Sequence, residues 1–230
     1  MIILSVKNLT KELSIPGSLP IPILKDLSFE IEKGDFVAIT GPSGSGKSTL
    51  LYLLGGLDTP TKGEIIFDGV NFSKMSDNEL TLERNKKIGF VYQFHYLLAE
   101  FTALENVIMP LLASEKMSNY EAKKRGKEIL DLVGLSDRLD YFPKQLSGGQ
   151  QQRVSVARAL SNNPMVIFGD EPTGNLDTKN SQAIYELFRK LNKEQNQTII
   201  IVTHDPMIAK QADRQINLID GVIDYDRRNI

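Results

Sequence analysis

The segment Gly41–Thr49, GPSGSGKST, has the residue types and the spacing of a phosphate-binding loop. Its glycines let backbone N–H groups point into one concavity, and the helix expected after it adds the positive end of its dipole. Lys47 supplies a positive charge for the β- and γ-phosphates, and Ser48 supplies a hydroxyl for Mg²⁺. A Gly/Ser-rich turn is the alternative, but the flanking strand and helix favour nucleotide binding. The predicted nucleotide-binding residues are Gly41, Pro42, Ser43, Gly44, Ser45, Gly46, Lys47, Ser48 and Thr49.

Three apolar runs each end in polar residues that can take part in phosphate hydrolysis. Gln93 ends KIGFVYQ, Asp170 and Glu171 follow MVIFG, and His204 ends TIIIVTH. Ligands of open α/β sheets bind beyond the carboxyl ends of the strands, so we expect these side chains at the edge that carries the phosphate loop. Asp170 can hold Mg²⁺ through water, and Glu171 can orient and deprotonate the attacking water. His204 can donate toward the γ-phosphate and Gln93 can sense the metal, although each residue alone could also be a solvated strand end.

The segment Leu146–Gln150, LSGGQ, predicts the start of a helix and a second anion site. Ser147 is a helix cap, and Gln150 closes the capping box. Gly148 and Gly149 would expose backbone N–H groups at the helix N-terminus. One chain with two phosphate-seeking surfaces indicates that two chains share each nucleotide.

The elements that must position these residues are short strands and amphipathic helices. Strands are expected where β-branched and bulky residues gather between turn residues, at Ile2–Val6, Leu27–Ile31, Phe36–Thr40, Gly63–Gly69 and Lys87–Gln93. The proline-rich stretch 14–23, SIPGSLPIPI, is expected to be a loop. The runs MVIFGD and TIIIVTH are typical of buried parallel strands.

Three helices are expected in the second half of the chain. The first begins at a capping box of Ser118 and Glu121 and stops at Gly134, and the second begins at Ser147 and stops before Pro164. The third, Lys179–Lys193, is amphipathic. Its inward face is expected to consist of Ile184, Leu187, Phe188 and Leu191.

Composition limits the class of protein. A chain of 230 residues with 41% hydrophobic residues suits one α/β domain, with or without an inserted subdomain. The absence of cysteine excludes disulfides, thiolate catalysis and cysteine-bound zinc. A net charge of -2 does not favour nucleic acid as a partner. The N-terminal residues are not expected to be a secretory signal, and no apolar run approaches the ~20 residues that cross a bilayer, so no membrane insertion is expected.

These motifs resemble the nucleotide-binding subunits of ABC transporters over nearly the whole chain. The resemblance implies a single ATP-binding domain, 1–230: a P-loop α/β core with an antiparallel β subdomain and an inserted helical subdomain at 94–163. It implies ATP and Mg²⁺ as ligands, with Ser48, Gln93 and Asp170 at the metal. It further implies that Glu171, His204 and Gln93 are the catalytic residues.

The resemblance also implies how two chains assemble. Two subunits of this family stack head to tail, with each ATP between one phosphate loop and the signature of the other chain, which here is Ser147, Gly148, Gly149 and Gln150. Asp177, in the D-loop GNLD, would lie at that dimer interface. Leu13 stands where the family usually has an aromatic residue that stacks on adenine, so a weaker or less selective grip on the base is expected.

The apolar stretch QFHYLLAEFTALENVIMPLL, 93–112, lies where this family receives a helix of its membrane permease. Phe94, His95 and Tyr96 are the expected docking residues. Six aliphatic residues of the stretch could be core of the helical subdomain, and most of the six are expected to be: Leu97, Leu98, Leu104, Val107, Ile108 and Leu111. The chain would then act as a peripheral protein on the cytoplasmic side of the inner membrane.

Within the family, the stretch most resembles lipoprotein-releasing ATPases of the LolD type. The segments SGGQQQRVSVARAL and DEPTGNLD are shared with macrolide-export (MacB type) and cell-division (FtsE type) ATPases, which remain alternatives. A P-loop kinase has no need of LSGGQ. Non-transport ABC ATPases carry long coiled coils or a second cassette, for which this chain has no room.

Overall fold

The computed structural model describes residues 1–14, 16–113 and 117–229. The chain forms two compact units, one built from Met1–Arg84 with Asn196–Ile230 and the other from Asn85–Gln195. Helix α2 (Asp77–Lys87) carries the chain from the first unit to the second. No helix in the described ranges is long and apolar enough to span a bilayer.

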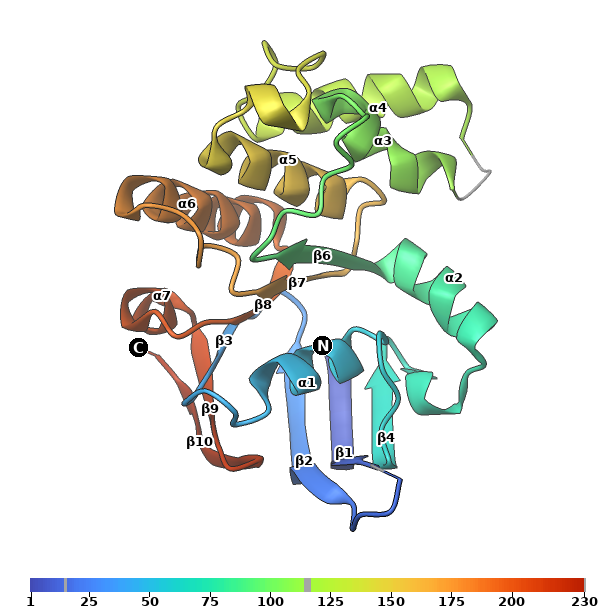
Figure 1. Ribbon diagram of the computed structural model, residues 1–230, viewed down its shortest axis with the longest axis vertical. Coiled ribbons are helices and arrows are strands. Elements are labelled where there is room, and N and C mark those ends of the chain that lie inside the picture. The colour runs from blue at the N-terminus through green and yellow to red at the C-terminus, as the bar shows by residue number, and fades with distance from the viewer. Residues whose placement is uncertain (15, 114–116, 230) are drawn as a thin grey trace. The chain divides into compact units, whose positions relative to one another are not determined.

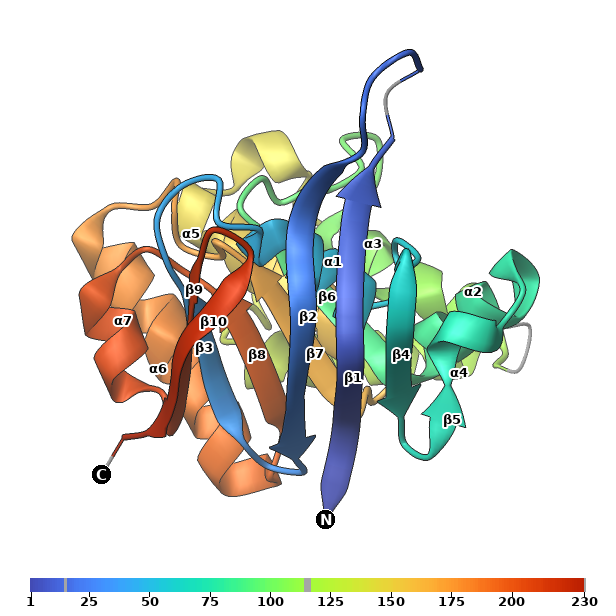
Figure 2. The same ribbon diagram turned by 90° about the horizontal axis from the view of Figure 1, so that it is seen from below.

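The first unit contains an antiparallel sheet in the order β2-β1-β4-β5 (Figure 2). Its strands are β1 (Ile2–Leu13), β2 (Ile21–Glu32), β4 (Lys62–Phe67) and β5 (Val70–Asn71). The loop predicted at 14–23 is wrong at its end, because β2 begins at Ile21 and Ile21 pairs with Leu13. Pro22 is tolerated there because β2 is an edge strand. Ile15 of that loop lies outside the described residues.

The first unit also contains strands in the order β10-β9-β3-β8. Buried β3 (Phe36–Thr40) lies between β8 (Thr198–Val202) and β9 (Arg214–Ile219) and is parallel to both. The run TIIIVTH was therefore correctly predicted as a buried parallel strand. Strand β10 (Val222–Arg228) returns antiparallel to β9. The unit's remaining elements are α1 (Lys47–Leu54), the 3-10 turn η1 (Phe72–Lys74) and α7 (Pro206–Gln211).

The second unit has one parallel strand pair, β6 (Ile88–Tyr92) with β7 (Val166–Asp170). Its helices are α3 (Ala103–Leu112), α4 (Asn119–Leu132), α5 (Gly148–Leu160) and α6 (Thr178–Gln195), with a 3-10 turn η2 at Pro143–Gln145. Helix α5 packs against α3, α4, α6 and β6 (Figure 1). It is therefore the helix around which this unit is built.

Several local predictions for the second unit are confirmed. Both predicted capping boxes are present, that of Ser118 with Glu121 and that of Ser147 with Gln150. Gly134 follows the end of α4 with a φ of 74°, a left-handed conformation that suits glycine. The predicted inward face of α6 is buried. A helical subdomain at 94–163 stays a prediction.

The apolar stretch 93–112 is only partly core. Leu104, Val107, Ile108 and Leu111 are buried on α3, as predicted. Leu98 is the exception, because its side chain is 40% exposed. Its backbone is fixed instead, because its N–H donates to Asn106 Oδ1 at 2.8 Å and its carbonyl accepts from Asn106 Nδ2 at 3.1 Å. Leu97 is half-buried.

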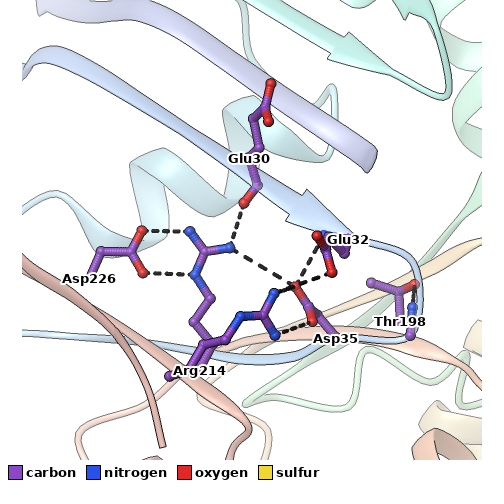
Figure 3. A network of polar contacts seen from close by, with 8 residues as sticks. Glu30, Glu32, Asp35, Thr198, Arg214 and Asp226 are labelled. Atoms are coloured by element: carbon purple, nitrogen blue, oxygen red, sulfur yellow. Dashed lines mark hydrogen bonds and ion pairs between the residues drawn. The ribbon is translucent and has the colours of Figure 1, made fainter. Parts of the chain in front are cut away.

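A charged network joins β2, β9 and β10 of the first unit (Figure 3). The guanidinium of Arg214 binds both carboxylate oxygens of Asp226, at 2.7 and 2.5 Å, and donates to the backbone carbonyl of Glu30. Asp35, whose side chain is 8% exposed, lies 4.0 Å from Arg214 and 3.0 Å from Arg228. These bonds raise the pKa of Arg214, first through the hydrogen bond to Asp226. The sequence interpretation missed β9 and β10, and these two strands are held together by this network of polar contacts.

Replacing Arg214 by Met should destabilise the protein by about 3 kcal/mol, because the partly buried carboxylate of Asp226 loses its counter-charge and the carbonyl of Glu30 loses its donor. Urea unfolding followed by circular dichroism measures this. Lys74→Met is the control, because its partner Glu64 forms an exposed pair 2.9 Å away. Equal midpoints for Arg214→Met and Lys74→Met would show that the network does not stabilise the fold.

Candidate nucleotide-binding site

In the first unit, the phosphate loop Gly41–Thr49 connects β3 to α1, as predicted. Gly41 has a φ of 140°, and a Cβ there would clash with the carbonyl oxygen of Leu218. Gly46 caps α1 with a φ of 94°, and a Cβ there would lie 2.7 Å from Leu24 Cδ2. The loop path therefore requires glycine at both positions.

The tip of the loop is open and its base is packed. Ser43 and Gly44 are exposed, and a Cβ at Gly44 would meet no atom within 4 Å. Ser45 is buried, and its hydroxyl has no hydrogen-bond partner among the residues that the structure describes. Lys47 Nζ donates to the carbonyl of Pro42 at 2.8 Å, so its side chain folds back over the loop. A phosphate at the tip would meet exposed backbone and a nearby cation.

His204 lies near the same edge of the first unit as the loop. Strands β3 and β8 are parallel, with Ile39 opposite Val202, and Thr203 N–H donates to the carbonyl of Ile39 at 3.1 Å. Gly41 and His204 therefore each follow the carboxyl end of one of two neighbouring strands. His204 is exposed there.

Gln93 and Glu171 are brought together within the second unit. Tyr92 and Asp170 are opposite each other at the ends of β6 and β7, and the two residues follow them directly. Glu171 has a φ of 47°, a left-handed conformation that costs about 1–3 kcal/mol in a non-glycine residue. Such strain is typical of functional sites, where the surroundings hold a side chain in one direction.

Gln93 itself is hydrogen-bonded to the D-loop. Gln93 Nε2 donates to Asn175 Oδ1 at 3.0 Å, and Asn175 Nδ2 donates to the carbonyl of Gln93 at 3.3 Å. A Cβ at Gly174 would lie 3.0 Å from Gln93 Nε2, so glycine permits this approach. The amide of Gln93 is therefore held beside the chain that leaves Glu171.

Gln152 is a site residue that the sequence interpretation missed. Its side chain is fully buried on α5, and its Nε2 donates to the carbonyl of Tyr92 at 3.2 Å and to that of Pro172. It thus ties together the backbone next to Gln93 and the backbone next to Glu171. Helical spacing could have indicated that Gln152 is buried, because it lies on the same face of α5 as Val156 and Ala159.

The signature forms an exposed helix start that packs against the first turn of α6. Ser147 Oγ accepts from Gln150 N–H at 3.3 Å, and Ser147 N–H donates to Gln150 Oε1 at 2.9 Å. Ser147 and Gly148 are exposed, whereas Gly149 is buried against Asn180, whose side chain a Cβ would hit. Asn180 in turn binds Asp177 through its N–H at 2.9 Å and its amide at 2.7 Å.

Those bonds have an electrostatic consequence for the D-loop. The backbone and then the side-chain hydrogen bond of Asn180 lower the pKa of Asp177, which therefore stays ionised. Asn180 thus links the signature to the D-loop within the second unit. It also leaves the first two signature residues facing solvent.

The predicted docking residues are mostly exposed. Phe94 is 60% and Tyr96 65% exposed, with ring centroids 6.5 Å apart, and Tyr92 lies edge-on to Tyr96 at 5.3 Å. His95, which lies between them in the sequence, is half-buried. Arg158 of α5 donates to the backbone carbonyls of His95, at 2.8 Å, and Tyr96, at 2.6 Å.

Comparison with known proteins identifies the family. The family model described as "ABC transporter" matches residues 24–174. Two solved structures of the cassette MJ0796 each align with a TM-score of 0.90 and 44% identity over 99% of both chains. One is a dimeric structure of a post-hydrolysis state of this ATP-binding cassette, bound to ADP and Pi, and the other a dimeric structure of this bacterial ABC transporter cassette.

The chain belongs to the ABC transporter family, and its class is that of the family's ATP-hydrolysing cassettes. The predictions of family, fold class and enzyme class are confirmed. Among curated proteins, the chain is similar to the lipoprotein-releasing system ATP-binding protein LolD 1 of Chlorobium chlorochromatii (strain CaD3). The two are 53% identical over 226 residues, which cover 98% of this chain and 92% of the relative.

The pKa of His95 should lie below the ordinary histidine value of about 6.5. Burial is the first cause and the positive charge of Arg158 the second. NMR titration resolves this because the chain has only two histidines, and the signals are assigned with a His204→Gln variant. Removing the charge in Arg158→Met should raise the pKa of His95. A His95 that titrates at or above the ordinary value would contradict this environment.

Proposed function

We propose that this chain is the ATPase subunit of an ABC transporter that releases lipoproteins from a membrane. The observation that carries the proposal is the 53% identity to LolD 1 over nearly the whole of both chains. The stretch 93–112 supports it, because it resembles the same type of ATPase. Macrolide-export and cell-division ATPases share the signature helix and the D-loop. The identity of the membrane protein that binds the chain would therefore distinguish these three functions.

The phosphate loop would bind the ATP phosphates, with Lys47 facing the β- and γ-phosphates. Ser48, Gln93 and Asp170 offer the hydroxyl, amide and carboxylate oxygens that Mg²⁺ prefers. When bound, Mg²⁺ neutralises charge on the phosphates. Glu171 would take the proton of the attacking water, and its left-handed backbone supports a fixed direction of the carboxylate. His204 would donate to the γ-phosphate.

Two copies of the chain would stack head to tail, with Ser147–Gly149 of one against the ATP of the other. The exposure of Ser147 and Gly148 at the start of α5 supports this role. Asp177 would lie at the same interface. Phe94, His95 and Tyr96 would dock a helix of the membrane permease, which places the chain as a peripheral subunit on the cytoplasmic side of the inner membrane.

The Glu171→Gln variant should bind ATP and lose steady-state turnover, because an amide cannot accept the proton of water. Lys47→Ala should instead weaken ATP binding, since it removes the cation of the loop. Phosphate release and fluorescent-nucleotide binding measure the two effects separately. Near-normal turnover of Glu171→Gln would remove Glu171 from the role of base.

Replacing Phe94 and Tyr96 together by Ala should release the chain from its permease without loss of ATP binding. Each aromatic anchor can contribute about 2 kcal/mol, so affinity should fall by more than about tenfold. Co-purification from detergent with the permease measures the change. Tyr120→Ala is the matched control, because this α4 tyrosine is 80% exposed outside the stretch. Full co-purification of the double variant would place docking elsewhere.

A further inference from the structure

Helix α5 holds the backbone of residues 92–96 at both ends. Gln152 donates to the carbonyl of Tyr92, and Arg158 donates to those of His95 and Tyr96. The two side chains start six residues apart on the helix, a rise of about 9 Å. The residues between the two attachments are Gln93 and Phe94, one proposed to sense the metal and the other to contact the permease.

These attachments determine the path of a strained segment. Tyr96 has a φ of 46°, which is unfavourable for an aromatic residue unless the surroundings hold it. The planar guanidinium of Arg158 presents two N–H groups in a fixed geometry to two successive carbonyls. A lysine ammonium has rotatable donors and lacks this rigid fork. Burial lowers the pKa of Arg158, so these bonds are made by a largely desolvated cation. Charge-assisted bonds of this kind are stronger than neutral ones.

The same helix also carries a second arginine, Arg153, whose hydrogen bond holds a different part of the second unit. Arg153 donates to the carbonyl of Val133, at the end of α4, at 2.8 Å. It has the same residue type, helix and kind of acceptor as Arg158, but its acceptor lies outside residues 92–96. Replacing Arg153 therefore shows the effect of losing an arginine–carbonyl bond on α5 without releasing residues 92–96.

We propose that Gln152 and Arg158 are positioning residues that make residues 92–96 follow the movement of α5. The proposal rests on the function given above, in which the start of α5, at Ser147, meets the ATP of a second chain. Pairing would then shift α5, and the two side chains would carry that shift to Gln93 and to the docking residues. Permease binding would act on the signature through the same contacts in reverse.

The first experiment measures ATP hydrolysis with and without the detergent-solubilised permease for Arg158→Lys, Arg158→Met and Arg153→Met. We expect Arg158→Met to bind ATP normally, whereas its stimulation by permease falls about tenfold or more. Arg158→Lys should show a smaller loss, and Arg153→Met should be stimulated like the unchanged chain. Equal losses in Arg153→Met and Arg158→Met, or normal stimulation of Arg158→Met, would overturn the proposal.

A second measurement needs no permease and uses the conservative variant. Amide hydrogen exchange of a peptide covering 92–96 is compared with and without ATP in a Glu171→Gln background. We expect ATP to change this exchange fully in the parent and in Arg153→Met, and to a smaller extent in Arg158→Lys. The same ATP response in Arg158→Lys would overturn the proposal. Failure of the proposed function is distinguishable, because the chain with an intact Arg158 would then show neither ATP binding nor permease stimulation.

Discussion

Hydrogen bonding between parallel strands is the constraint on which the site residues of each unit depend. In the first unit, the pairing of Ile39 with Val202 brings the phosphate loop and His204 to one edge. In the second unit, the pairing of Tyr92 with Asp170 sets Gln93 beside Glu171. A slip of one residue would reverse the face of every side chain in the shifted strand. The burial of β3, β7 and β8 therefore fixes the strand register, and with it the positions of the site residues.

Helix α5 adds a second constraint, because strand pairing ends where the functional loops begin. Backbone carbonyls beyond the strands need partners, and buried ones are costly if left without them. Gln152 satisfies two of these carbonyls and Arg158 two more. The helix that starts with the exposed Ser147 thus fixes the surroundings of Gln93 and Glu171. One element joins the proposed dimer surface, the proposed catalytic residues and the proposed docking segment.

The sequence predicted those parts of the molecule whose signals are local. The phosphate loop and the capping boxes depend on residues within one turn, and β7 and β8 are continuous apolar runs. It missed β9 and β10, which mix polar with apolar residues and are joined by the pair of Arg214 and Asp226. Helical spacing could place Gln152 on a buried face, but its acceptors lie 20 and 60 residues away in the chain. Long-range partners of this kind have no signal in a single sequence.

The central claim is that ATP pairs two copies of this chain through the start of α5. Sedimentation velocity of the Glu171→Gln variant, with and without ATP, tests it most directly. Adding Gly148→Asp is the control, because a Cβ there would only touch Leu176 Cδ2, at 3.5 Å, while the carboxylate would repel a phosphate. The account predicts that ATP doubles the mass of Glu171→Gln and leaves the control monomeric. An unchanged mass over a wide concentration range, or equal pairing of the control, would contradict it.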